Sequence, residues 1–194
     1  MNSREKILAA VKKNQPPLEE LPSLREIDAI QFDHPLEKFK SVLEGIGGVL
    51  IAVTGLQQVG DYVRHQFTEG DRYITTIPEL GTIDQIDHSN NAHQLEDVEV
   101  AVISGAFAVA ENAAIWVMAS ALKTRVLPFI CQHLVVVLHP QNIVHNMHEA
   151  YERIAADKYD YGVFIAGPSK TADIEQSLVL GAHGPKTMTV FIKE

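Results

Sequence analysis

The sequence predicts an α/β fold with three layers, in which helices cover both faces of a mostly parallel sheet. Its strand-sized runs are apolar throughout instead of alternating, as in GVLIAV at 48–53 and HLVVVLH at 133–139. Strands that are buried on both faces show this pattern. Segments with helical periodicity separate the runs, and two neighbouring parallel strands need such a crossover between them.

The predicted elements follow one another as this fold requires. A first helix is expected over 3–13 with Ser3 as its N-cap, and the Pro-rich acidic stretch after it reads as an arm. We therefore divide the chain into an N-terminal helix and arm, residues 1–34, and a single α/β domain, residues 35–194. Within the domain, helices are expected at 35–44, 55–67 and 142–157, and strands at 48–53, 98–104, 133–139, 161–167 and 187–193.

Composition excludes several classes of function. The 194 residues carry a formal net charge of −9, which argues against a nucleic-acid binder and against recruitment to an anionic membrane. The apolar runs are too short to span a bilayer, and the charged N-terminus is unlike a signal peptide, so we expect a cytoplasmic protein. Cys131 is the single cysteine, and it cannot form an internal disulfide or the thiolate cage of a metal cluster.

The run IAGPSKTADIEQSLVLGAHGP, residues 165–185, is rich in turn-forming and polar residues. Its first part reads as a strand, a turn and the start of a short helix capped by Ser169 or Thr171. These residues could have a purely structural role in the turn and the helix cap. Alternatively, the free N–H groups at the helix start could bind a carboxylate or phosphate. The candidate ligand-binding residues here are Gly167, Pro168, Ser169, Lys170, Thr171 and Asp173.

The same run closes with GAHGP, residues 181–185. Gly181 would end the predicted helix in a left-handed cap, and Gly184 would help to turn the chain into the last strand and lie beside the ligand. Turn chemistry does not explain His183. Its imidazole could carry protons near neutral pH, as a catalytic residue, or it could be an exposed loop histidine.

A second candidate site lies in AENAA, residues 110–114. Glu111 and Asn112 could be a catalytic nucleophile and its oxyanion partner, or Glu111 could be a carboxylate at an exposed turn or helix start. Arg125 is the strong cation of the neighbouring segment, and it could bind an anionic ligand or form a structural salt bridge. Both alternatives stay open for each residue.

The stretch HNMHE, residues 145–149, places two histidines beside a glutamate. On a helix whose buried stripe includes Met147, Tyr151 and Ile154, both histidines face water. The spacing also differs from the His-Glu-x-x-His pattern of zinc proteases. We therefore expect no metal site and no cofactor in this chain.

The C-terminal run GPSKTADIEQSLVLGAHGP, followed by TMTVFI, closely resembles the signature of the LUD-domain family of lactate utilisation protein C-like proteins. ISGAFAVAENAAIWV and RVLPFICQHLVVVLHPQNIV precede it in the expected order. The resemblance implies a fold similar to the NagB/RpiA/CoA-transferase superfamily. It also implies a part in oxidising L-lactate to pyruvate alongside partner subunits that carry iron–sulfur clusters, with a small carboxylate or a CoA-type compound as ligand.

The resemblance also shows one departure and supplies two alternatives. Many relatives carry Thr-Gly-Thr where this chain has Asn112-Ala113-Ala114, which removes a glycine and two hydroxyls from the loop. AENAA is similar to the Ser-Glu-Asn-Gly element of CoA transferases, so one alternative is an acyl-CoA transferase or thioesterase that uses Glu111. The other is a non-catalytic scaffold subunit, which could form homo-oligomers.

These interpretations share one geometric expectation. Ligands of parallel α/β sheets bind at the carboxyl ends of the strands. We therefore expect Ser169, Thr171, His183 and Glu111 to meet in a single pocket at that edge of the sheet.

Overall fold

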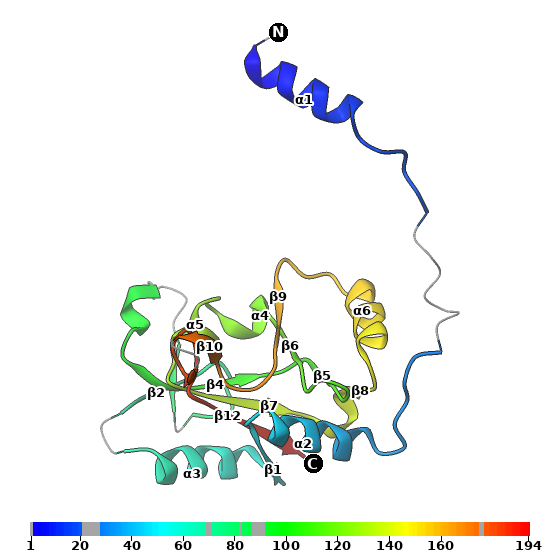
Figure 1. The fold of residues 1–194 in the computed structure, drawn as a ribbon. Helices are drawn as coiled ribbons and strands as arrows, with labels where there is room; N and C mark the ends of the chain where they lie inside the picture. Colours follow the sequence, from blue (N-terminus) through cyan, green and yellow to red (C-terminus); the bar gives the residue numbers. More distant parts are fainter. Residues whose placement is uncertain (1, 21–27, 69–70, 82, 87–91, 175–176) are drawn as a thin grey trace.

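The computed structural model of the chain describes residues 2–20, 28–68, 71–81, 83–86, 92–174 and 177–194 (Figure 1). Its centre is a parallel sheet of six strands, ordered β1-β12-β7-β4-β2-β3. The C-terminal strand therefore lies between the first strand and β7. The strands are β1 (Val49–Val53), β2 (Arg72–Thr75), β3 (Asp84–Gln85), β4 (Val98–Ser104), β7 (His133–Leu138) and β12 (Thr187–Lys193).

Elements pack on both faces of this sheet, which confirms the three-layer α/β fold. Alternate side chains of each strand point to opposite faces. One face packs against α3 (Leu56–Gln66), where Val59 and Val63 meet Val135 and Phe191. The other face packs against a second layer that contains α2 (Pro35–Gly45), α4 (Ala119–Leu122) and α5 (Leu127–Ile130).

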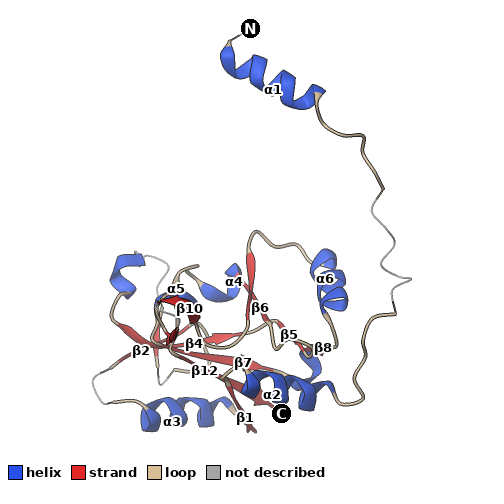
Figure 2. Cartoon of the chain, viewed as in Figure 1, coloured by secondary structure: helices blue, strands red, loops and turns tan. Residues whose placement is uncertain are grey.

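The second layer also contains a smaller sheet that the sequence did not predict (Figure 2). Its order is β8-β5-β6-β9, and β6 runs antiparallel to both β5 and β9. The expected strand at 161–167 is β9, so it is a member of this sheet and not of the parallel one. The elements of this region are β5 (Phe107–Val109), β6 (Ile115–Met118), β8 (Ile143–Val144), α6 (Met147–Ala156) and β9 (Gly162–Ile165).

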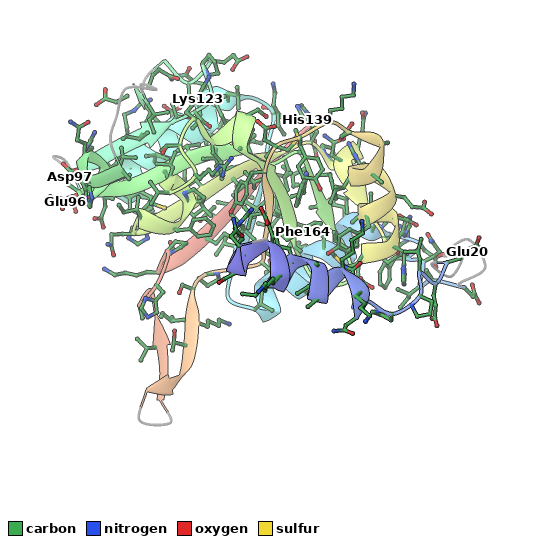
Figure 3. All side chains as sticks on the ribbon, turned by 90° about the horizontal axis from the view of Figure 1, so that it is seen from above. Glu20, Glu96, Asp97, Lys123, His139 and Phe164 are labelled. Carbon is green, nitrogen blue, oxygen red and sulfur yellow. The ribbon has the colours of Figure 1, made fainter. Side chains whose placement is uncertain are left out.

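Aromatic rings hold the small sheet together. Trp116 on β6 lies opposite Phe164 on β9, with ring centroids 4.8 Å apart, and its edge meets Tyr159 at 5.4 Å. Phe164 is labelled in Figure 3. The tryptophan ring occupies the space beside Gly162, where a Cβ atom would lie 2.1 Å from Cζ2 of Trp116.

The helix α1 (Ser3–Lys13) is confirmed, although its N-cap is Asn2 and not Ser3. Asn2 and Glu5 form a capping box in which each side chain accepts a hydrogen bond from the backbone of the other residue. No residue of α1 is buried, and Figure 1 shows the helix away from the domain. The arm after it returns to the domain, where the Ile30 carbonyl accepts a bond from Asn146 Nδ2.

Two local predictions are wrong. Residues after Ser169 form the hairpin β10 (Lys170–Ile174) and β11 (Ser177–Leu180) instead of a helix. Gly181, which was expected to end a helix, directly follows the strand β11. Its φ of +76° therefore belongs to the turn that leaves the hairpin. The side chains of residues 172–178, including Asp173, lie outside the described part of the structure.

The expected helix at 142–157 is confirmed only over its second part, which is α6. The 3-10 turn Pro140–Asn142 and the strand β8 come before it. Another 3-10 turn spans Ala92–Leu95. His145 therefore does not face water on a helix: its Nδ1 accepts a hydrogen bond from Phe32 N at 3.0 Å. Tyr151, expected in the buried stripe of α6, is exposed. Among the described helices, none combines the length and apolarity needed to cross a bilayer.

The contact between Gly162 and Trp116 gives a test of the small sheet. Gly162→Ala should lower the free energy of unfolding by about 1–3 kcal/mol, because the new methyl group overlaps the indole ring. The matched control is Gly45→Ala, since a Cβ there has no neighbour within 4 Å and the residue ends α2. This control should be neutral or stabilising by up to about 1 kcal/mol. Urea unfolding of both variants measures the difference, and equal stabilities would contradict the packing described.

Candidate functional site

Two loops that carry most of the predicted site residues meet beside the central sheet. We call residues 167–171, which include the first two residues of β10, and residues 181–186 the amino-edge loops. Ser169 N donates to the Pro185 carbonyl at 2.9 Å, and Gly181 N donates to the Ser169 carbonyl at 3.1 Å. Lys186 N donates to the carbonyl of Gln132 at 2.7 Å, and Gln132 directly precedes β7.

These contacts place the loops at the amino ends of β7 and β12, and not at the expected carboxyl ends. Two labels in Figure 3 mark the edges of the sheet. Asp97, just before β4, marks the amino edge, and His139, just after β7, marks the carboxyl edge. In the same view the β10–β11 hairpin projects from the body of the domain. Residues 167–171 do follow the carboxyl end of a strand, β9, but this strand belongs to the small sheet. The expected place at the carboxyl ends of the parallel sheet is therefore wrong for these loops.

Two glycines allow the loops to approach their neighbours. Gly167 has φ of +72°, and a Cβ atom there would lie 3.0 Å from side-chain atoms of Ile46. Gly184 has φ of +156°, and a Cβ atom there would lie 3.2 Å from Cβ of Ser169. Both positions thus combine a backbone conformation that favours glycine with close contact to another segment.

The polar side chains of the amino-edge loops differ in exposure. Ser169 and Thr171 are half-buried, whereas Lys170, His183 and Lys186 are exposed, and Pro168 is buried. The Lys170 side chain extends back over the turn before β1, with Nζ 3.5 Å from the position that a Cβ of Gly47 would take. The loops therefore present hydroxyls and ammonium groups to solvent in a chain whose net charge is negative.

Next to these loops lies a cluster that sequence reasoning did not include among the site residues. Nδ1 of His133 lies 2.7 Å from Oγ1 of Thr187, and its Nε2 lies 3.4 Å from Oε1 of Glu99. The ring of Phe67 packs on the imidazole, with centroids 4.8 Å apart. One signal was available in the sequence, because both His133 and Thr187 are polar residues at the first position of a buried strand.

The surroundings of His133 favour its neutral form. Burial lowers the pKa of the imidazole below its ordinary value of 6.5, and the Lys186 ammonium lowers it further. Glu99 and Asp71 act in the opposite direction without cancelling the shift in pKa. A neutral imidazole can accept a proton at one nitrogen while it donates from the other.

Glu111 lies in a different place, in the turn between β5 and β6. Its Oε1 accepts a hydrogen bond from Met147 N at 2.7 Å, and its N donates to the His145 carbonyl. Asn112 accepts a bond from Ala114 N at 3.0 Å through its own Oδ1. Glu111 thus satisfies a free N–H at the start of α6, which corresponds to the structural alternative for this carboxylate.

Ala113, between these residues and Ala114, is buried and has φ of +57°. This left-handed conformation costs an alanine about 1–2 kcal/mol relative to a right-handed one. Glycine adopts it without that cost, and the resemblance to the LUD family places a glycine here in many relatives. Ala113 therefore adopts a backbone conformation that suits glycine better than alanine.

Arg125 occupies a third place. Its guanidinium lies 4.7 Å above the Tyr161 ring and makes no ion pair among the described residues. Tyr161 also lines an open cavity of about 660 Å³ between α4 and the loop before β9, together with Ser120, Lys158 and Tyr159. The predicted residues thus occupy three regions, and Glu111 does not share a pocket with Ser169, Thr171 and His183.

A central parallel sheet with both faces covered defines an α/β domain. Comparison with known proteins identifies its family. A family model described as LUD domain matches residues 36–192, so the chain belongs to the LUD-domain family. A crystal structure of a DUF162 family protein from Deinococcus radiodurans has the same fold, with a TM-score of 0.64 at 18% identity. That alignment covers 82% of this chain and 96% of the other.

Two curated relatives are similar in sequence. A lactate utilization protein C from Shouchella clausii is 28% identical over 62% of this chain and 54% of its own length. A lactate utilization protein C from an Exiguobacterium strain is 32% identical over 46% of this chain and 40% of its own length. The aligned region thus spans about half the length of these relatives.

The capping contact of Glu111 can be measured as stability. Glu111→Ala should lower the free energy of unfolding by about 1 kcal/mol, because Met147 N loses its acceptor and the start of α6 loses a negative charge. Glu152→Ala, an exposed change on the same helix, should stay within about 0.5 kcal/mol of the parent. Chemical denaturation of the two variants provides the comparison, and an unchanged Glu111→Ala protein would show that the cap contributes nothing.

The lowered pKa of His133 predicts a dependence of stability on pH. The imidazole of His133 binds a proton more tightly in the unfolded chain than in the folded one. The contribution of His133 to the free energy of unfolding is therefore complete above the ordinary pKa of 6.5, and it is lost as pH falls through the lowered pKa. His133→Gln should flatten the curve of unfolding free energy against pH in that window. His139→Gln, which changes an exposed histidine at the other edge, should leave the curve as it is. Urea unfolding across the window measures both, and parallel curves for parent and His133→Gln would refute the assignment.

Proposed function

We propose that this chain takes part in the utilisation of lactate, as a cytoplasmic component of a system that oxidises L-lactate to pyruvate. The observation that carries the proposal is the LUD-domain match over residues 36–192, together with similarity to two proteins named lactate utilization protein C. The amino-edge loops lie within the matched region.

The ligand in this proposal is a small carboxylate held by the amino-edge loops. Lys170 and Lys186 supply exposed ammonium groups, and Ser169 and Thr171 supply hydroxyls that are half-buried. Ammonium and hydroxyl groups are suitable donors for a carboxylate.

Electron transfer in this proposal takes place in partner subunits that carry iron–sulfur clusters. Burial raises the pKa of Cys131 to about 12, so this thiol resists the deprotonation that metal ligation requires. A single cysteine also cannot supply the set of thiolates that a cluster needs. In this proposal the electrons from lactate pass to the clusters of those partner subunits.

The helix α1 is our candidate for docking to such a partner. Its apolar residues Ile7, Leu8 and Val11 are all exposed in this structure. The helix is also basic, since Arg4, Lys6, Lys12 and Lys13 outnumber Glu5, whereas the whole chain is acidic. An apolar stripe flanked by positive charge suits an acidic partner surface with an apolar groove. The alternative of an acyl transferase that uses Glu111 receives less support, because that carboxylate caps α6.

Growth on lactate tests the proposal. Deletion of the gene, in a strain without another lactate-oxidising route, should abolish growth on L-lactate while growth on pyruvate continues. The parent gene should restore growth, and Lys170→Gln should restore it less well because one ligand cation is lost. Lys158→Gln, an exposed lysine away from the amino-edge loops, is the matched control and should restore growth fully. Normal growth of the deletion strain would remove the assignment.

A further inference from the structure

We propose that Thr187, His133 and Glu99 form a catalytic triad that transfers an acyl group from a small ester or thioester to water. Thr187 is the nucleophile, His133 the general base and Glu99 the positioning residue. This activity goes beyond the proposed role in lactate utilisation and does not rest on it.

The three residues come from three neighbouring strands of the central sheet. Thr187 and His133 are direct partners in the register of β12 and β7, and Glu99 lies on β4, which pairs with the other side of β7. Sheet pairing therefore fixes the spacing of the three backbones. The side chains continue the same order, with 2.7 Å from Thr187 Oγ1 to His133 Nδ1 and 3.4 Å from His133 Nε2 to Glu99 Oε1.

The chemistry of the two neighbours determines where the imidazole carries its proton. An ionised Glu99 can only accept hydrogen bonds, so Nε2 of a neutral His133 carries the hydrogen that faces it. Nδ1 is then unprotonated and can only accept. The short contact at Nδ1 is consequently a bond that the Thr187 hydroxyl donates, which is the arrangement of a nucleophile about to lose its proton.

The surroundings of the imidazole are consistent with a general base. The charged groups that face it are Glu99 on β4, Lys186 before β12 and Asp71 before β2, and Phe67 packs on the ring. Partial burial and Lys186 keep the ring neutral near pH 7, so that it is free to accept a proton. The His133 side chain retains 20% of its exposure, and Thr187 is exposed, so a substrate can reach the hydroxyl.

The reaction balances without any further reagent. Thr187 Oγ attacks the acyl carbon while its proton moves to His133 Nδ1, and the bond between the acyl carbon and the leaving oxygen or sulfur then breaks. The leaving group takes the proton from Nδ1, which leaves an acyl ester on Thr187. Water attacks this ester, gives a proton to Nδ1, and releases the acid as the threonine oxygen recovers its proton.

Acetylation by p-nitrophenyl acetate tests the proposal on the purified full-length chain. We expect release of p-nitrophenol and an acetyl group on Thr187, found by peptide mass spectrometry after an acid quench. Thr187→Val should remove this acetyl group, and Thr187→Ser should restore a hydroxyl that is acetylated. His133→Gln should slow acetylation of residue 187 by about 10²-fold, because the general base is lost.

Matched variants separate the triad from ordinary surface reactivity. Thr54→Val and His139→Gln change an exposed threonine and an exposed histidine at the other edge of the sheet, and neither should alter acetylation of Thr187. Acetyl groups on lysines alone, or equal acetylation of Thr187 with and without His133, would overturn the proposal. If a variant fails to fold, the acetylation map of the parent chain decides by itself. Growth on lactate is a separate readout, so the two proposals fail independently.

The pH profile distinguishes a positioning role of Glu99 from a structural one. The rate at Thr187 should fall as pH decreases through the pKa of His133, because a protonated imidazole cannot accept the threonine proton. Glu99→Gln removes a carboxylate that raises this pKa, so the acid limb of the profile should move to lower pH. An acid limb that stays in place after Glu99→Gln would show that Glu99 does not act through His133.

Discussion

The parallel pairing of the C-terminal strand β12 between β1 and β7 is the constraint on which the rest of the structure depends. This strand contributes Val190 and Ile192 to the core on one face of the sheet and Phe191 to the core on the other. Because the strand is parallel to β7, the segment before it must arrive at the amino edge. The amino-edge loops and the cluster around His133 both result from this one arrangement.

Backbone groups at the ends of strands and helices find hydrogen-bond partners in different ways at the two sides of the molecule. At the amino edge, Lys186 N and Ser169 N bond to carbonyls of neighbouring segments, and the side chains around them are left to face solvent. On the other side of the molecule, Glu111 and Asn146 satisfy groups at the start of α6 and in the arm. At the amino edge, backbone groups bond to one another, so the side chains remain available for a ligand. At the start of α6, the side chains of Glu111 and Asn146 are themselves the hydrogen-bond partners.

The LUD family and the three-layer fold could both be obtained from the sequence, and most of the helices and strands lie within a few residues of their predicted bounds. Apolar runs such as 133–139 determine a buried strand because few other structures bury both faces of so short a segment. The site was harder to predict. Glu111 was a plausible nucleophile by residue type, and only its contact with Met147 N shows that the carboxylate is already engaged.

The sequence by itself determined which segments are buried, where turns interrupt them, and that the single cysteine cannot hold a cluster. Only the tertiary structure decided which strand neighbours which, and hence which polar residues meet. Ser169 starts a hairpin and not a helix, and His133 meets Thr187 across a sequence separation of 54 residues. The reason is physical: local periodicity records the burial of each segment, whereas register and sheet order depend on packing between distant segments.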